Sequence, residues 1–284
     1  MRVLVTGSEG KIGKEVMKLL DGHEVYALDK KGGASYKIDL STDPLNSLID
    51  FQPEIIIHLA ASFERTDETR AFHAINFQDN ILATYRLNQA IAKMKVAPKQ
   101  YIYASSYLVY DPNLYLSPVP LRDPRILSEV DELSPRNLIG HAKLYGEGEI
   151  NFLQRNVHPS MKVTHARIFR VFGEGGQEFV SRVIDWRKNG FPVDIWKPEN
   201  RFDYIAASDC ASALVSLFDH EGIYNVGYGV SHSIKDILDV VKPEIRTIHM
   251  NDLYESTEAD IMKIEEETGW SPKVNVLDWI KGKL

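Results

Sequence analysis

The feature that most constrains the fold is a glycine-rich turn directly after the first apolar run. Residues 2–6 form a short strand-like run, which leads into Gly7, Gly10 and Gly13 at three-residue spacing. Residues 11–20 then carry apolar side chains at helical spacing. A strand, a glycine turn and a helix in this order bring backbone N–H groups and the positive end of a helix dipole to one point. Such a point can hold a pyrophosphate, and larger side chains there would block its approach.

Strand-like and helical segments alternate through the first half of the chain. Further strand-like runs cover residues 24–28, 54–60, 100–104 and 163–170, and helical ones cover 80–93 and 143–154. This alternation predicts a doubly wound α/β fold of the Rossmann type, with a parallel sheet and crossover helices. After about residue 170 the elements become shorter. We therefore expect residues 1–165 to form a dinucleotide-binding domain. Residues 166–284 would form mainly a smaller C-terminal substrate lobe, interleaved with late Rossmann elements.

The composition excludes several classes of protein. The net charge of -7 argues against a nucleic-acid partner, because phosphate binding needs clustered Lys and Arg. Cys210 is the only cysteine, so we expect a small buried side chain, no intramolecular disulfide and no metal site. The sequence enters a strand without a basic leader, and no apolar run approaches the ~18 residues of a membrane span. We expect no membrane contact and a cytoplasmic location.

Asp29 ends the second strand-like run, where an acid accepts the ribose hydroxyls of a dinucleotide. A carboxylate there repels the 2′-phosphate of NADP, so the residue favours NAD. Lys30 and Lys31 follow directly, and they either form a solvated turn or hold that phosphate. The prediction is NAD binding with a preference over NADP.

Four further segments resemble one known family. Asp39-Leu40 resembles a pair that meets adenine, and residues 58–61 (His-Leu-Ala-Ala) resemble a segment under the pyrophosphate. Residues 80–84 resemble an Asn-x-x-Gly/Ala-Thr motif, and residues 135–147 resemble Pro-x-x-x-Tyr-Gly-x-Ser-Lys-x-x-x-Glu. On these segments the chain resembles an extended short-chain dehydrogenase of the NAD-dependent epimerase/dehydratase type. Later matches to sugar-nucleotide members cover residues 167–173, 201–209, 224–227 and 269–272.

The resemblance implies a set of cofactor contacts. The residues expected to contact NAD are Gly7, Glu9, Gly10, Lys11, Ile12, Gly13, Asp29, Asp39, Leu40, Leu59, Ala60, Ala61, Asn80, Ser105 and Lys143.

The catalytic motif lacks the family's reactive residue. The family moves the hydroxyl proton with a tyrosine, whose phenol pKa is lowered by a lysine four residues later and by the oxidised nicotinamide. Here Lys143 occupies the lysine position and Ser106 the position of the catalytic hydroxyl, but Ile139 occupies the tyrosine position. Isoleucine can neither titrate nor donate a hydrogen bond.

Three interpretations follow for a chain that would modify a nucleotide-activated sugar by epimerisation, dehydration or reduction. In the first, the acid/base has moved to Tyr107, next to Ser106, or to His141, although helical spacing directs His141 and Tyr145 away from Lys143. In the second, the chain is a catalytically inactive or impaired regulatory or partner protein that binds NAD and a sugar nucleotide. In the third, it is a lyase or reductase whose chemistry needs no phenol.

The second half offers candidates for substrate binding. Ser106 and Tyr107 are expected to contact the sugar, while Arg170, Arg201 and the loop of residues 173–176 are expected to hold a diphosphate. We therefore expect a nucleoside-diphosphate sugar as partner. Helices 80–93 and 143–154 resemble the pair that forms a homodimer interface in the family.

Overall fold

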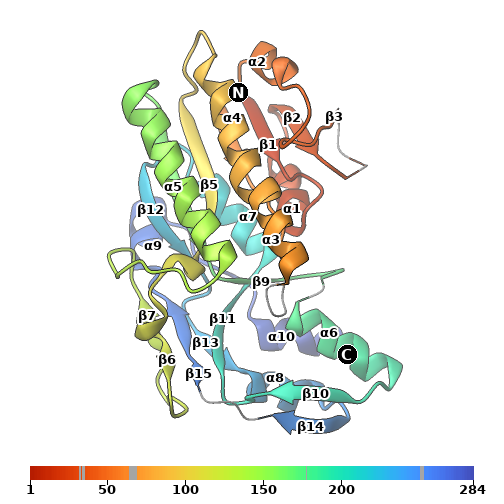
Figure 1. Cartoon of the computed structure of the whole chain (residues 1–284). Helices are drawn as coiled ribbons and strands as arrows, with labels where there is room; N and C mark the ends of the chain where they lie inside the picture. Colours follow the sequence, from red (N-terminus) through yellow and green to blue (C-terminus); the bar gives the residue numbers. More distant parts are fainter. Residues whose placement is uncertain (32, 34–35, 64–68, 177, 250–252) are drawn as a thin grey trace. The chain divides into compact units, whose positions relative to one another are not determined.

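The computed structural model describes residues 1–31, 33, 36–63, 69–176, 178–249 and 253–284. Two compact units make up the chain (Figure 1), and each is woven from several segments. Unit 1 comprises residues 1–110, 133–167 and 214–224, and unit 2 comprises residues 111–132, 168–213 and 225–284. The domain boundary near residue 165 stays a prediction. Within the described ranges, no helix has the length and apolar character needed to cross a membrane.

A seven-stranded sheet forms the centre of unit 1. Its strands, in spatial order, are β12 (Gly222–Val226), β8 (Lys162–Ile168), β5 (Gln100–Ser106), β4 (Ile55–His58), β1 (Arg2–Thr6), β2 (Glu24–Asp29) and β3 (Tyr36–Lys37). The pairs from β3 to β5 are parallel. The predicted doubly wound Rossmann fold is confirmed, and strand β1 lies at the point where the order reverses.

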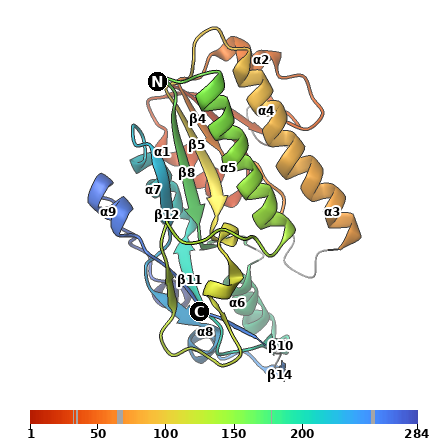
Figure 2. The ribbon, with the colours of Figure 1, turned by 60° about the vertical axis from the view of Figure 1, so that its left-hand side comes forward.

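Helices cover both faces of this sheet. Helix α1 (Lys11–Leu19) lies on one face, while α4 (Ala83–Ala92) and α5 (Leu138–Asn156) lie side by side on the other (Figure 2). Helix α2 (Asn46–Phe51) packs with α4. The core under α4 and α5 is apolar and tyrosine-rich; its members include Leu4, Ile56, Leu87, Tyr101 and Ile150.

Two helices start earlier than the sequence pattern predicted. The helix expected from residue 80 continues backwards through a π-helical segment, η1 (Phe77–Leu82), into α3 (Arg70–Asn76), because Thr69 caps the Phe72 amide. The helix expected from residue 143 begins at Leu138, because the Asn137 side chain accepts a hydrogen bond from the Gly140 amide. Both caps satisfy amides that would otherwise have no partner within the helix.

Unit 2 consists of short elements. Its strands are β6 (Leu116–Ser117), β7 (Arg125–Leu127), β9 (Arg170–Phe172), β10 (Val193–Trp196), β11 (Arg201–Ala206), β13 (Ser231–Ser233), β14 (Ile245–His249), β15 (Tyr254–Glu255) and β16 (Thr257–Ala259). Its helices are α6 (Phe179–Asn189), most of α7 (Ala207–Ser216), α8 (Ile234–Val241), α9 (Met262–Thr268) and α10 (Val276–Lys281). Ser233 followed three residues later by the acid Asp236 is a pattern that predicts a helix start, and the two residues form the capping box of α8. Cys210 is buried in α7, as predicted.

Candidate functional site

The glycine turn is packed too tightly for any larger residue. Gly7 has φ +73°, and a Cβ atom there would lie 2.7 Å from the Ala60 nitrogen. A Cβ atom on Gly13 would lie 2.2 Å from the Gly7 carbonyl oxygen. The turn therefore presents backbone, with Gly10 as the N-cap of α1, where N–H groups attract an anion.

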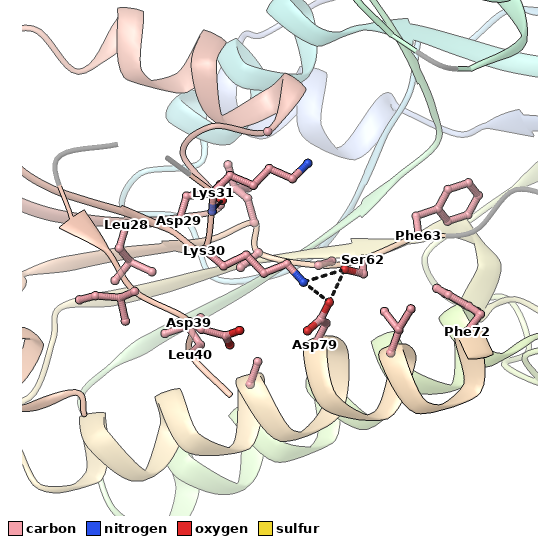
Figure 3. Close-up of a pocket in the computed structure, with 18 residues that line it drawn as sticks. Leu28, Asp29, Lys30, Lys31, Asp39, Leu40, Ser62, Phe63, Phe72 and Asp79 are labelled. Carbon is pink, nitrogen blue, oxygen red and sulfur yellow. Dashed lines mark hydrogen bonds and ion pairs between the residues drawn. The ribbon is translucent and has the colours of Figure 1, made fainter. Parts of the chain in front are cut away.

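Asp29 ties this turn to the end of β2. Its carboxylate accepts hydrogen bonds from the Glu9 amide at 3.1 Å and from the Lys31 amide at 2.8 Å. The side chain is buried and also lines a cavity of about 470 Å³ beside the turn (Figure 3). An oxygen atom of a carboxylate can accept more than one hydrogen bond, so Asp29 can still bind ribose hydroxyls.

Several predicted cofactor residues line this cavity together, namely Gly7, Gly10, Asp29, Asp39, Leu40, Leu59, Ala60 and Ala61. Asp39 accepts hydrogen bonds from the Ser41 amide and hydroxyl at 2.8 and 2.6 Å. Burial raises the pKa of Asp39, but the bonds from Ser41 and the charges of Lys30 and Arg86 outweigh it, so the pKa lies below its usual range. The other residues expected to contact NAD lie outside the lining, namely Glu9, Lys11, Ile12, Gly13, Asn80, Ser105 and Lys143.

A buried histidine supports the cavity from behind. The Thr6 hydroxyl accepts from the Ala60 amide at 3.2 Å and meets His58 Nδ1 at 2.6 Å. His58 Nε2 meets the Thr84 hydroxyl at 3.0 Å, and that hydroxyl donates to the Asn80 carbonyl. Because the Thr84 hydroxyl donates elsewhere, His58 Nε2 must carry the proton in this contact, and a neutral imidazole then accepts from the Thr6 hydroxyl at Nδ1. Burial, together with the charge of Lys143, lowers the pKa of His58 to about 3.

Asn80 positions the loop after β4. Its side chain accepts from the Ser62 amide at 2.8 Å and donates to the Ser62 carbonyl at 2.9 Å. This reciprocal pair holds Ala61 and Ser62 against the cavity. Asn80 itself is buried, and its neighbour Asp79 faces the cavity instead. Sequence reasoning missed Asp79 and Ser62; their polar side chains beside the two matched motifs were the available signal.

The catalytic motif lies on α5. Ile139 and Lys143 are both buried, one helical turn apart, whereas His141 and Tyr145 are exposed. Lys143 Nζ donates to the Ala104 carbonyl on β5 at 2.6 Å and lies 4.9 Å from the centre of the Tyr103 ring. Burial lowers the pKa of Lys143 to about 8, against the opposing charge of Glu147.

A buried ion pair stands behind this lysine. Arg167 donates two hydrogen bonds to the Glu147 carboxylate, at 3.1 and 2.9 Å, and the Ser105 hydroxyl donates a third at 2.5 Å. Burial raises the pKa of Glu147, but Arg167 outweighs it and lowers the pKa. Ser106 has a different role, since its hydroxyl accepts from the Leu108 amide. The sequence offered Glu147 as a motif position but gave no indication of its pairing with Arg167.

The described tyrosines offer no obvious substitute for the missing phenol. Tyr107 lies in a short 3-10 helix, η2 (Tyr107–Val109), and only 4% of its surface is exposed. The pKa values of Tyr101, Tyr103, Tyr145 and Tyr204 all shift upward, with burial as the largest cause. An upward shift makes a phenol harder to ionise at neutral pH.

Arg170 and Arg201 bind different partners within unit 2. Strand β9 pairs with β11 so that Arg170 lies opposite Tyr204, and alternation along β11 directs Arg201 to the other face of the sheet. The Arg170 guanidinium lies 3.6 Å from the centre of the Phe202 ring and 3.3 Å from Glu255. Arg201 donates to the Ser231 carbonyl at 3.0 Å. These contacts of the two guanidinium groups are therefore with different residues.

The family can be assigned from the sequence match over this fold. The model of the "NAD dependent epimerase/dehydratase family" matches residues 3–227. The chain belongs to this family. No curated protein sequence matches it significantly.

Solved structures with the same fold carry related ligands. The chain is similar to MoeE5 in complex with UDP-glucose and NAD, at 23% identity and TM-score 0.85, covering 99% of this chain and 96% of that one. It is similar to UDP-glucuronic acid 4-epimerase from Bacillus cereus in complex with NAD, at 21% identity and TM-score 0.82, with coverages of 99% and 96%. A third similar structure is UDP-glucose 4-epimerase from Thermus thermophilus in complex with NAD, at 23% identity and TM-score 0.82, with coverages of 99% and 97%.

Proposed function

We propose that the cavity beside the glycine turn binds NAD. The observation that supports this is the cradle itself: Gly7 and Gly13 leave no space for a side chain, and Asp29 lies where ribose hydroxyls would be accepted. The adenine would lie toward Asp39 and Leu40. Bound NAD would supply a hydride acceptor, which no side chain of the chain can replace.

We further propose that the substrate is a nucleoside-diphosphate sugar, which the protein epimerises, dehydrates or reduces. The single observation that carries this is the preserved framework at the catalytic end: Lys143 is buried one turn after residue 139 and fixed to β5, beside Ser105 and Ser106. The UDP-glucose held by MoeE5 makes UDP-sugars the first candidates. Lys143 would hold the nicotinamide ribose, and the Ser106 hydroxyl would contact the sugar.

A second candidate function has its own observation. Ile139 cannot transfer a proton, and it occupies the buried position one helical turn before Lys143. A protein with this arrangement would bind NAD and a sugar nucleotide with slow turnover or none, as a regulatory or partner subunit. The two candidates share their ligands and differ only in turnover.

A panel of ligands tests the proposal. The melting temperature of the NAD-bound protein would be measured with UDP-, GDP-, CDP- and dTDP-sugars, followed by NADH fluorescence with each sugar that binds. A ligand at 100 times its Kd adds about 2.7 kcal/mol to the free energy of unfolding. Epimerisation and dehydration return the cofactor to NAD, so turnover is followed by chromatography of the sugar nucleotide. Stabilisation with formation of a modified sugar nucleotide supports the enzyme, and stabilisation without any product supports the binding protein. No stabilisation by any sugar nucleotide would contradict both.

We also propose a homodimer through α4 and α5. The two helices pack together and expose Tyr85 of α4 and Tyr145 and Phe152 of α5, and Phe77 is exposed in η1, which leads into α4. Tyr85 lies close enough to Tyr145 to contribute to the raised pKa of that phenol. Exposed apolar patches of this kind mark interfaces between proteins. The cytoplasmic location stays a prediction.

Light scattering at micromolar concentration tests the dimer. Wild-type protein should elute with twice the mass of one chain, and Phe152→Glu should elute as a monomer. Val130→Glu changes an equally apolar exposed side chain in unit 2 and should leave the mass unchanged. A monomeric wild-type protein would contradict the proposal.

A further inference from the structure

A lysine side chain crosses the cavity and is held at its far end. Lys30 follows β2 directly, and its ammonium group forms an ion pair with Asp79 of η1 (Figure 3). The same ammonium lies 3.4 Å from the hydroxyl of Ser62, which also donates to Asp79. All three residues line the cavity. Three segments far apart in the sequence therefore meet in one polar cluster inside the dinucleotide site.

The charges that line the cavity are unevenly distributed. The lining contains three carboxylates, on Asp29, Asp39 and Asp79, and two ammonium groups, on Lys30 and Lys31. Among the described residues, Lys31 forms no ion pair closer than 4 Å, whereas the charge of Lys30 is balanced by Asp79. One of the two cations that could meet an anionic ligand is thus already occupied.

The ion pair between Lys30 and Asp79 matters for binding of the 2′-phosphate, the group that distinguishes NADP from NAD. A 2′-phosphate would lie beside Asp29, next to the backbone of Lys30 and Lys31, and two lysines there could bind it. Asp29 repels such a phosphate, and two backbone amides hold its carboxylate in place. To reach such a phosphate, Lys30 would have to leave Asp79, whose side chain is only 11% exposed and would lose its ion pair. Removing one partner from a shielded charge pair is unfavourable.

We propose that Asp79 is a specificity-determining residue of the dinucleotide site: it holds Lys30 on the far side of the cavity and so disfavours NADP. The proposal rests on NAD binding in this cavity, and it adds a residue to the preference that Asp29 sets. Ser62 assists by donating to the same carboxylate, which fixes the position of Asp79. The preference for NAD is therefore encoded by a contact between β2 and η1 as well as by the acid at the end of β2.

A double-mutant cycle tests this role through binding alone. Calorimetry would give the Kd for NAD and for NADP with wild-type protein, Asp79→Asn, Lys30→Met and the double variant. Asparagine keeps the shape and the acceptor for Ser62 but removes the charge that holds Lys30. In Asp79→Asn we expect NADP to bind about tenfold more tightly or better relative to NAD, the size of one hydrogen bond to a charged group. In the double variant this gain should disappear.

Two controls separate the alternatives. Asp43→Asn removes a nearby carboxylate that is outside the lining, and it should leave the preference unchanged. Asp79→Ser provides a second test of the same charge, and melting curves verify that each variant is folded. An unchanged NADP-to-NAD ratio in a folded Asp79→Asn or Asp79→Ser protein overturns the proposal. An equal gain in the double variant also overturns it, since Lys30 would then have no part.

The same measurements distinguish this inference from the proposed function. If wild-type protein binds NAD but the variants behave alike, only the role of Asp79 fails. If wild-type protein binds neither dinucleotide, NAD binding itself fails, and the specificity role fails with it.

Discussion

The cofactor end and the catalytic end of the site in unit 1 differ in how far their residues match the family pattern. At the cofactor end, the glycines and Asp29 match the family pattern and form a tight cradle. At the catalytic end, the framework of Ser105, Lys143 and Glu147 matches equally well, yet Ile139 replaces the residue that would move the proton. The cofactor end retains the residues that its ligand would need, and the catalytic end retains a framework without its reactive group.

The difference teaches which parts of a site depend on backbone and which on side-chain chemistry. A pyrophosphate is recognised by backbone N–H groups and a helix dipole, so its site survives wherever the fold survives. Proton transfer needs one titratable group at one position. The buried Glu147–Arg167 pair also belongs to the fold, because a lone buried charge would destabilise it. A preserved framework therefore does not by itself establish catalysis.

The largest effect we expect is a gain of turnover in Ile139→Tyr. The new phenol would lie one turn before Lys143, whose ammonium would favour its ionised form. General acid/base assistance contributes about 10²–10⁴-fold, so hydride transfer should rise by up to that factor. The measurements are the formation of modified sugar nucleotide by chromatography and the transient bound NADH in a single turnover.

His141→Tyr is the matched control for that gain. It adds a phenol to the exposed face of the same helix and should leave turnover unchanged. If the Ile139→Tyr protein is folded and binds NAD but turns over no faster than wild-type protein, the catalytic end lacks more than one side chain.

At the cofactor end we expect Gly13→Ala to abolish most of the binding. The added Cβ would lie 2.2 Å from the Gly7 carbonyl oxygen, so the turn must shift, at a cost of about 1–3 kcal/mol. If this cost falls on the bound state, the Kd for NAD should rise about 5- to 150-fold. Gly148→Ala, whose Cβ meets no atom within 4 Å, should leave the Kd unchanged and stabilise α5 by up to about 1 kcal/mol. An unchanged Kd in Gly13→Ala would contradict the prediction, because it would show that the glycine turn can shift without weakening NAD binding.

The free energy of unfolding should depend on pH through His58, the buried histidine behind the cavity. Its pKa is 6.5 in the unfolded chain and about 3 in the folded state, so between these values the unfolded state binds more protons. The stability contribution of the neutral ring is fully present above pH 6.5 and is lost as the pH falls, by about 1.4 kcal/mol per pH unit. Denaturant unfolding between pH 4 and 7 measures this slope. His58→Gln keeps a donor and an acceptor and should reduce it; an identical slope would contradict the neutral, buried role.

The smallest effect is expected from Tyr107→Phe. If the acid/base has not moved to Tyr107, loss of its hydroxyl should change turnover by less than about twofold and stability by about 1 kcal/mol. Steady-state kinetics on the sugar nucleotide that binds would measure it. Abolished turnover in a folded Tyr107→Phe protein would instead show that the acid/base has moved to this residue, and the catalytic end would no longer be the impaired one.

Local patterns in the sequence were sufficient for the fold and for much of the cofactor end. Apolar runs separated by amphipathic segments predicted the parallel sheet, and the glycine spacing predicted the turn after β1. Helical periodicity alone placed Ile139 and Lys143 on a buried face and His141 on the exposed one. The α8 cap followed from Ser233 and Asp236. These features depend on residues within a few positions of each other, so their physical causes can be read along the chain.

Only the tertiary structure decided which distant side chains meet. Lys30 and Asp79 are paired across the cavity, and Arg167 is paired with Glu147, although neither contact leaves a pattern in the sequence. The register of β9 against β11 directs Arg170 and Arg201 to opposite faces, which neither strand specifies by itself. Periodicity determines the face on which a residue lies, whereas its partner is set by the packing of other elements against that face.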